Sequence, residues 1–197
     1  MALTDSGNTL DRSGSERLLS RQWVYRGRAV SLRLDTVEKP SGRKTTRDVV
    51  EHDDCVAIVP IDAEDNIILV RQFRHAVGKE LLEVPAGGIQ PGETPEQAVC
   101  RELQEETGYF PNKLKKLGGF YAAPGYCTEY LYLYLATDLV SRPLQAEDTE
   151  SIEPVRVRLA DIPGLIAEGQ ICDAKSIAGL LTVSLLGLVA GYLKMLS

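Results

Sequence analysis

Apolar and polar residues alternate between residues 17 and 51 with the two-residue period of a half-buried strand. The alternating positions are Val30, Leu32 and Leu34 in one segment and Thr45, Arg47 and Val49 in a second segment. Such alternation predicts strands, and the Ser41-Gly42 pair between the segments predicts a turn. We therefore expect an antiparallel hairpin here, as part of a small N-terminal sheet over residues 17–51.

The middle of the chain consists of longer apolar runs. Cys55–Ile61 and Ile67–Phe73 have strand length, flank a turn at residues 62–66, and suit the strands of a buried sheet. Three more runs of strand length are residues 81–86, 114–121 and 129–136. Strands and helices follow one another without the regular rhythm of a βαβ fold, which favours an α+β class or a mixed-sheet sandwich.

One helix can be delimited from its end signals. Thr94 is a suitable N-cap, and Gln97 completes a Thr-x-x-Gln capping box. Pro95 suits the first helical position, where its missing N–H has no helical partner to lose. Gly108 can adopt the left-handed conformation that follows a last helical turn. The sequence therefore predicts a helix from Pro95 to about Thr107.

This helix carries an acidic face beside an apolar one. At about 100° per residue, three carboxylates share one side: Glu102, Glu105 and Glu106. Val99 and Leu103 form a neighbouring stripe that can pack on a sheet. Arg101 precedes Glu105 by one turn, so an ion pair can fix the direction of that carboxylate. Most acidic faces are simply solvated, but three carboxylates this close repel one another, and Mg²⁺ would relieve that repulsion.

Two further helices are indicated at residues 159–168 and from Asp173 onward. Ile177–Leu193 contains no charged residue, and its 17 residues reach the lower limit for a transmembrane helix. Glycine, serine and threonine dilute its apolarity, and Lys194 follows at once. We therefore expect a buried or dimer-facing helix, with a membrane anchor as the alternative.

Composition narrows the function classes. The net charge of −6 and the pI near 5.1 argue against a nucleic-acid-binding surface, which is normally basic. The four cysteines show neither a zinc-ligand spacing nor a dense disulfide framework, so reduced thiols and a cytoplasmic location are expected. Residues 1–16 lack the basic and apolar parts of a secretory signal and are expected to form a disordered tail.

The segment from Gly87 to Tyr109 matches a known signature. Its fixed positions are Gly87, Glu93, Arg101-Glu102-Leu103, Glu105-Glu106, Gly108 and an apolar Tyr109, in the spacing of the Nudix box. The chain therefore resembles the Nudix hydrolases. The resemblance implies an α/β/α sandwich with a mixed sheet over residues 52–197, preceded by the small antiparallel sheet.

The resemblance also implies a set of metal ligands. Glu102 and Glu106 would be the principal ligands of Mg²⁺, with Mn²⁺ as an alternative ion. Glu105 would be a further ligand or would orient the attacking water. The backbone carbonyl of Ala86 would supply another oxygen. Mg²⁺ keeps several waters and also binds substrate phosphate, so a few protein carboxylates are sufficient.

The catalytic base of the ADP-ribose pyrophosphatase branch of this family lies outside the box, in an acidic loop ahead of a late strand. The matching loop here is residues 145–152, in which Glu150 is the first candidate and Asp148 the second. A solvated run of charges is the alternative for this loop.

Other residues outside the box resemble the same branch. Pro124 stands sixteen residues beyond Gly108, the spacing typical of ADP-ribose pyrophosphatases. Arg47 and Arg74 would bind substrate phosphates or the terminal ribose, since a guanidinium can bind two oxygens at once. Glu83 and Glu129 would contact metal or ribose hydroxyls, or else form structural ion pairs.

The nucleoside pocket departs from the pattern of the branch, in which the N-terminal sheet helps to form both the dimer and this pocket. Relatives place an aromatic residue after Tyr-Arg-Gly to stack on adenine, whereas this chain has Arg28 after Tyr25-Arg26-Gly27. Tyr25, Trp23 or a partner subunit then becomes the candidate for stacking, or Arg28 itself through its planar guanidinium.

The function implied by the resemblance is Mg²⁺-dependent hydrolysis of ADP-ribose to AMP and ribose 5-phosphate by a homodimer. One alternative is a hydrolase of another nucleoside diphosphate sugar. A second is a module that senses ADP-ribose or NAD metabolites without turnover, which the complete set of carboxylates argues against. Neither nucleic acid nor a membrane is expected as a partner.

Overall fold

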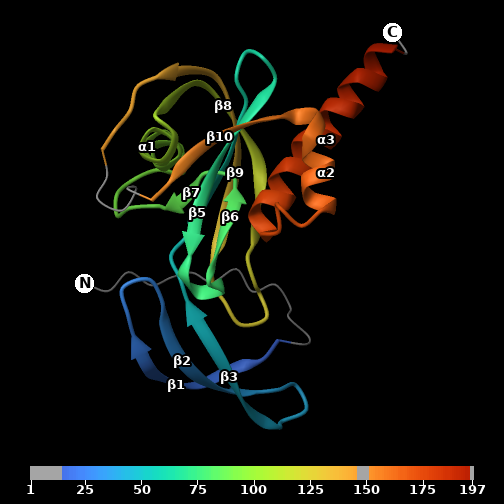
Figure 1. Cartoon of the computed structure of the whole chain (residues 1–197). Coiled ribbons are helices and arrows are strands. Elements are labelled where there is room, and N and C mark those ends of the chain that lie inside the picture. Colours follow the sequence, from blue (N-terminus) through green and yellow to red (C-terminus); the bar gives the residue numbers. More distant parts are fainter. Residues whose placement is uncertain (1–14, 146–150, 196–197) are drawn as a thin grey trace, which may run out of the picture. The chain divides into compact units, whose positions relative to one another are not determined.

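The computed structural model describes residues 15–145 and 151–195, with side chains described up to residue 187. Most of the expected disordered tail therefore lies outside the described residues. The chain divides into two compact units (Figure 1). The first unit comprises Met1–His52 and Ala123–Thr128, and the second comprises Asp53–Ala122 and Glu129–Ser197.

The first unit contains a three-stranded antiparallel sheet in the order β1-β2-β3. Its strands are β1 (Arg17–Arg26), β2 (Ser31–Glu38) and β3 (Lys44–Glu51). The expected hairpin is confirmed as β2–β3, and Gly42 takes a positive φ of 78° in its turn. The inserted segment Ala123–Thr128 joins this unit because the Val50 N–H donates to the Tyr126 carbonyl at 2.7 Å.

The second unit contains two sheets. A four-stranded mixed sheet has the order β7-β4-β9-β8, with β4 and β9 parallel, and a three-stranded antiparallel sheet has the order β10-β5-β6. The strands are β4 (Cys55–Pro60), β5 (Asn66–Arg74), β6 (Lys79–Glu83), β7 (Ala86–Gly88), β8 (Tyr109–Tyr121), β9 (Tyr130–Ser141) and β10 (Glu153–Arg158). This arrangement confirms the expected α+β class with a mixed sheet.

The strands predicted to be buried behave differently from one another. Every residue of β4 is buried, as expected. In β5 only Ile67–Val70 is buried, and Phe73 near its end is 51% exposed. Phe73 lies beyond the end of the pairing with β10, which reaches only Arg71, so this last part of β5 pairs with β6 alone.

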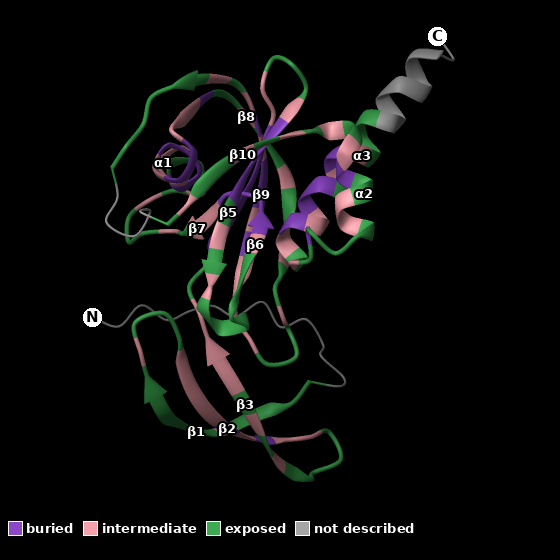
Figure 2. Ribbon diagram, in the orientation of Figure 1, coloured by how far each residue is buried: buried purple, intermediate pink, exposed green. Residues whose placement is uncertain are grey.

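The helices cover opposite faces of the four-stranded sheet, giving the layers of an α/β/α sandwich (Figures 1 and 2). On one face, Val56 and Ile58 of β4 pack with Val99 and Leu103 of α1 (Pro95–Thr107). On the other face, the alternate β4 residues Ala57 and Val59 belong to the core that includes helices α2 (Ile162–Ala167) and α3 (Ala174–Met195). A strand buried on both faces therefore carries both cores.

Helix α3 packs closely on the sheet near its start. A methyl group on Gly179 would lie 3.0 Å from Val59 Cγ2 and 3.1 Å from Leu133 Cδ1, so the glycine permits close approach to β4 and β9. Leu180 and Val183 are buried, whereas Leu181, Leu185 and Leu186 are exposed. Within the described residues, no helix combines the length and apolarity that a membrane span requires.

Candidate active site

The helix that carries the acidic residues forms as its end signals predict. The Thr94 side chain accepts a hydrogen bond from the Gln97 N–H, the Gln97 side chain accepts one from the Thr94 N–H, and Pro95 opens the helix. Gly108 adopts the left-handed conformation at φ 78° and ends it. Local signals therefore fix both ends of α1. The orientation of α1 about its own axis directs the acidic residues toward β7 and packs the apolar stripe against the sheet.

Arg101 organises the acidic face through four contacts. Its guanidinium donates to Glu93 at 2.8 and 2.9 Å and to the Gly88 carbonyl at 2.8 Å, which ties the helix to the turn before it. It also donates to Glu102 at 2.6 Å and to Glu105 at 3.2 Å, the latter being the predicted i,i+4 pair. One cation therefore orients two of the predicted metal-binding carboxylates.

The Glu102 carboxylate lies against the backbone of Gly87 in β7. A methyl group on Gly87 would overlap with the Glu102 carboxylate, whereas a methyl group on Gly88 would meet no described atom within 4 Å. A side chain at position 87 would therefore force the Glu102 carboxylate to move, whereas a side chain at position 88 would meet no such obstacle. Burial raises the pKa of Glu102, and the neighbouring Glu105 carboxylate adds to the effect against the opposing influence of Arg101.

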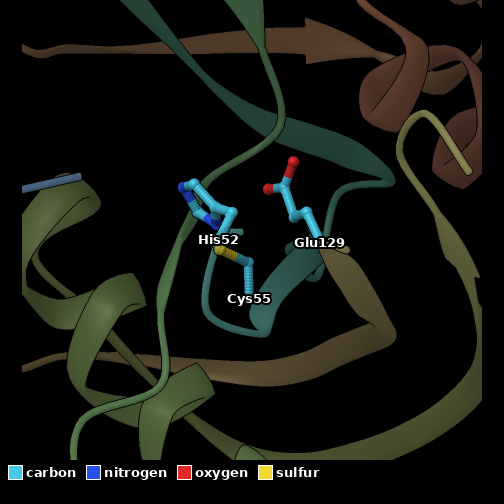
Figure 3. Close-up of side chains that lie close together, drawn as sticks. All are labelled: His52, Cys55 and Glu129. Atoms are coloured by element: carbon cyan, nitrogen blue, oxygen red, sulfur yellow. The ribbon is translucent and has the colours of Figure 1, made fainter. Parts of the chain in front are cut away.

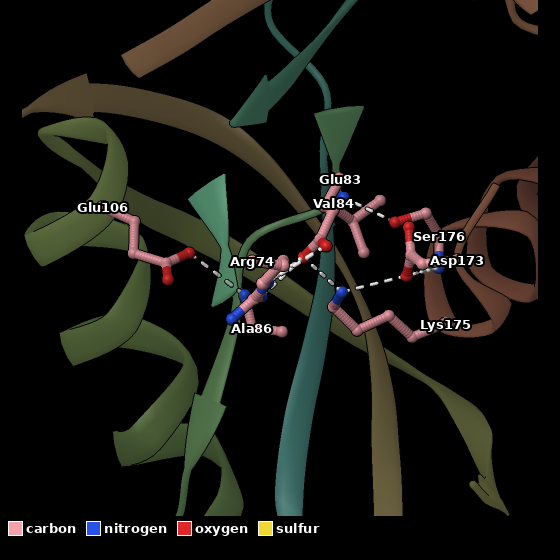
Figure 4. Close-up of polar contacts among 8 residues, drawn as sticks. All are labelled: Arg74, Glu83, Val84, Ala86, Glu106, Asp173, Lys175 and Ser176. Carbon is pink, nitrogen blue, oxygen red and sulfur yellow. Dashed lines mark hydrogen bonds and ion pairs between the residues drawn. The ribbon is translucent and has the colours of Figure 1, made fainter. Parts of the chain in front are cut away.

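Glu106 is the most deeply buried carboxylate of the face, at 8% exposure. Its Oε2 accepts a hydrogen bond from the Ala86 N–H at 3.1 Å (Figure 4). Burial, followed by the charge of Glu102, raises the pKa of Glu106 to about 8. Burial and a neighbouring carboxylate both make ionisation of Glu106 unfavourable. A bound cation would offset this cost by attracting the negative charges.

The residues present fit a hard divalent cation such as Mg²⁺. Such ions prefer oxygen ligands, and Glu102, Glu105 and Glu106 supply carboxylate oxygens on one helix face, with the Ala86 backbone beside them. Arg101 keeps two of these side chains directed and leaves the third, Glu106, in contact with β7. These roles in metal binding remain predictions.

Arg74, the predicted phosphate-binding arginine of the second unit, belongs to a buried ionic network (Figure 4). Its Nε and Nη2 donate to the Glu83 carboxylate at 3.1 and 2.5 Å, and Lys175 Nζ donates to the same carboxylate at 2.6 Å. Lys175 also donates to Asp173 at 2.9 Å. Glu83 therefore forms the structural ion pairs that were one of its two expected roles.

Glu129 lies close to Cys55 in the second unit (Figure 3). Burial raises the pKa of the Cys55 thiol to about 12, and the Glu129 carboxylate adds to this through its charge and a hydrogen bond. His52, which Figure 3 also draws, belongs to the first unit. A role for Glu129 in binding substrate stays a prediction.

The other predicted substrate-binding residues lie in the first unit. Arg47 pairs with Glu16 at 2.5 Å, and Tyr25 is 59% exposed, with its ring so close to Gly27 that a methyl group there would overlap with it. Pro124 lies in an exposed turn of the inserted segment. The two candidate bases, Asp148 and Glu150, lie outside the described residues.

Sequence reasoning missed the part of Lys175 in this site. The Asp-Ala-Lys-Ser stretch from Asp173 to Ser176 indicated only the start of a helix, whereas Lys175 reaches a carboxylate 92 positions earlier in the chain. A lysine in the first turn of a long apolar helix was the available signal, since a cation there gains nothing from the helix dipole.

Comparison with known proteins connects this geometry to a family. Residues 51–180 match the family model described as NUDIX domain. An ADP-ribose pyrophosphatase of Bacillus subtilis is 34% identical over 167 residues, covering 84% of this chain and 90% of the relative. One of Mycobacterium tuberculosis is 36% identical over 168 residues, covering 84% and 81%. The crystal structure of an ADP compounds hydrolase matches with a TM-score of 0.82 and 27% identity, covering 89% of this chain and 96% of that chain.

Proposed function

Because this chain belongs to the Nudix family, we propose that it hydrolyses the diphosphate bond of ADP-ribose, giving AMP and ribose 5-phosphate, with Mg²⁺ as its metal and Mn²⁺ as an alternative. Two relatives that it matches over most of its length are named ADP-ribose pyrophosphatases. The observation that carries the proposal is the set of three carboxylates on α1, of which Arg101 directs two and burial raises the pKa of Glu106 to about 8.

We assign different roles in the reaction to different residues of the chain. Glu102 and Glu106, with the Ala86 carbonyl, hold the metal, which when bound neutralises phosphate charge and lowers the barrier to attack by water. Glu105 holds a further ligand position or orients that water. Arg74, whose Nη1 makes no hydrogen bond to any described residue, directs the diphosphate.

Water attack requires a group that takes up the water proton. Glu150 is the first candidate for this base and Asp148 the second. As one oxygen–phosphorus bond forms, the bond from that phosphorus to the bridging oxygen breaks, and both products leave as phosphate monoesters.

The remaining parts of the substrate are proposed to bind to Arg47, Tyr25 and Glu129. The protein is proposed to be a cytoplasmic homodimer. Neither nucleic acid nor a membrane is proposed as a partner.

An assay of several substrates tests the proposal. The full chain is incubated with Mg²⁺ and ADP-ribose, ADP-mannose or GDP-mannose, and alkaline phosphatase converts only the monoester products to inorganic phosphate. We expect ADP-ribose to give the highest kcat/KM, EDTA to abolish turnover, and Mg²⁺ to restore it. Equal or greater activity with another sugar nucleotide would overturn the choice of ADP-ribose.

A sensing module is the second candidate function. It predicts that ADP-ribose binds to the wild-type protein in calorimetry while neither Mg²⁺ nor Mn²⁺ gives products. The hydrolase instead predicts products with the wild type and loss of turnover in Glu106→Gln, with binding of ADP-ribose partly retained. The two functions are therefore separated by measuring binding and product release on the same samples.

A further inference from the structure

The two cations on Glu83 are bound to it in different ways. Arg74 approaches side-on, with Nε within 3.1 Å of both carboxylate oxygens and Nη2 at 2.5 Å from Oε2. Lys175 Nζ binds the same Oε2 at 2.6 Å. This leaves Nη1 of Arg74 without a hydrogen bond to any described residue, on a side chain that is 39% exposed. Arg74 thus binds a buried carboxylate through two of its nitrogens and keeps the third without a partner among the described residues.

Lys175 is itself held in place from the start of α3. Asp173 Oδ1 accepts a hydrogen bond from Lys175 Nζ at 2.9 Å and another from the Ser176 N–H at 3.1 Å. Ser176, which is fully buried, accepts a hydrogen bond from the Val84 N–H at 2.8 Å. The ammonium group is thus held by Asp173 as well as by Glu83, and the next residue attaches the start of α3 to Val84, between β6 and β7.

Glu83 is 1% exposed, so solvent cannot compensate for the loss of either cation. When Arg74 and Lys175 are both present, they neutralise the charge of Glu83 together. Arg74 then binds the carboxylate through Nε and Nη2 only. The influence of the network also reaches the acidic helix, because the charges of Arg74 and Lys175 both lower the pKa of Glu106 against the effect of burial. A buried carboxylate left with one cation would draw that cation inward.

We propose that Lys175 is a positioning residue for the substrate diphosphate: by sharing Glu83, it keeps Arg74 in the side-on arrangement that leaves Nη1 for a phosphate oxygen. This inference rests on the proposed function, because it assumes that Arg74 binds the diphosphate. Lys175 does not touch the substrate in this scheme. Its removal withdraws Arg74 toward Glu83 and weakens binding of the diphosphate.

The first experiment compares Lys175→Met with Ser176→Ala, two changes in the same helical turn. Each removes one attachment of α3, but only the first changes the cations on Glu83. We expect Lys175→Met to raise KM about tenfold or more with a smaller change in kcat, as loss of a charge-assisted hydrogen bond to phosphate would. Ser176→Ala should lower the thermal midpoint and leave KM unchanged. An equal rise of KM in both variants would overturn the proposal.

A double-mutant cycle gives a readout that a purely structural role would not produce. Arg74→Ala should raise KM by itself, and adding Lys175→Met should then change KM no further, because there is no guanidinium left to position. Additive effects of the two changes would contradict the proposal. Lys175→Arg, which keeps the charge, should restore part of the affinity. If Lys175→Met alone does not fold, it is tested in the Glu83→Gln background. No carboxylate remains there to draw Arg74 inward, so Lys175→Met should change KM no further, and a further rise of KM would contradict the proposal.

The experiment separates failure of this inference from failure of the proposed function. If the wild type cleaves a different sugar nucleotide, KM is measured with that compound and the same ratios are expected. If the wild type cleaves none, the proposed hydrolysis is wrong, and the dissociation constant of ADP-ribose, measured by calorimetry in the wild type and Lys175→Met, tests the positioning role alone. An unchanged dissociation constant would overturn it.

Discussion

The backbone of Gly87 lies directly against the carboxylate of Glu102, with no room for a β-carbon between strand β7 and helix α1. The contact joins the first fixed position of the Nudix box to one of its predicted metal ligands, fifteen residues later. Gly88, the next residue, has open space in the direction of its missing side chain. The contact with Glu102 thus gives a physical reason for glycine at position 87 that does not apply at position 88.

Gly87→Ala is expected to abolish most of the activity by displacing Glu102. The added methyl group forces the carboxylate or the strand to move, and misplacement of a metal ligand by about 1 Å can cost about 100-fold in rate. Gly88→Ala is the matched control and should retain activity within a few-fold. The measurement is kcat/KM with saturating Mg²⁺, together with thermal unfolding of each variant. Equal activities would show that Glu102 is not held by this contact.

The stability of the metal-free protein is expected to fall as pH rises from about 4.5 to about 8. Burial and the charge of Glu102 raise the pKa of Glu106 from 4.5 to about 8, so the folded state keeps a proton that the unfolded chain releases. The unfolded state then binds fewer protons throughout this window, which lowers the free energy of unfolding by at most about 1.4 kcal/mol per pH unit. Above about pH 8 this contribution levels off.

Urea titrations in EDTA at several pH values measure this dependence. Glu106→Gln should be less sensitive to pH over the same window, because the replaced side chain does not titrate. Saturating Mg²⁺ should raise the stability of the wild type most at the alkaline end, since the ion binds the ionised carboxylate. A wild type whose metal-free stability increases through this window would contradict the raised pKa.

The helix of the site could be predicted from the sequence because its determinants are local. Thr94, Gln97 and Gly108 act within one helical turn of the ends that they define, and Arg101 reaches Glu105 along the same helix. The fold class followed from strand-length runs and from a signature that matches a known family. For the helix and for the strands, the residues that determine the element lie within it or next to it in the sequence.

Other features depended on contacts between distant segments. Phe73 is exposed in the part of β5 that β10 does not reach, and the apolar run alone does not show where that pairing ends. The binding of Lys175 to Glu83 joins two elements 92 residues apart, which no local pattern encodes. The roles of Asp148 and Glu150 stay predictions, as they lie outside the described residues.

The cysteines are expected to differ in their reaction with alkylating reagents. Cys55 is 8% exposed, and burial, with a smaller effect of Glu129, raises the pKa of its thiol to about 12, so little thiolate forms near neutral pH. Cys172 is exposed. Brief treatment with iodoacetamide at pH 8, followed by peptide mass spectrometry, should therefore modify Cys172 and spare Cys55. Because burial is the larger cause, Glu129→Gln should still leave Cys55 protected, whereas rapid alkylation in that variant would assign the protection to the carboxylate.

Arg101 is expected to be more important for stability than an exposed arginine that forms a single ion pair. It binds Glu93, Glu102 and Glu105 with its own side chain only 17% exposed, so Arg101→Ala leaves three poorly solvated carboxylates without their cation. Removing one partner from a largely buried ionic group costs about 3 kcal/mol.

Arg158, which pairs with Asp161 at 2.8 Å on the surface, supplies the control, and Arg158→Ala should cause no measurable change. Arg101→Lys keeps the charge but cannot reach all the acceptors, so its stability should lie between the wild type and Arg101→Ala. Urea unfolding in EDTA measures these differences without a contribution from metal, and equal losses in Arg101→Ala and Arg158→Ala would contradict the role of Arg101.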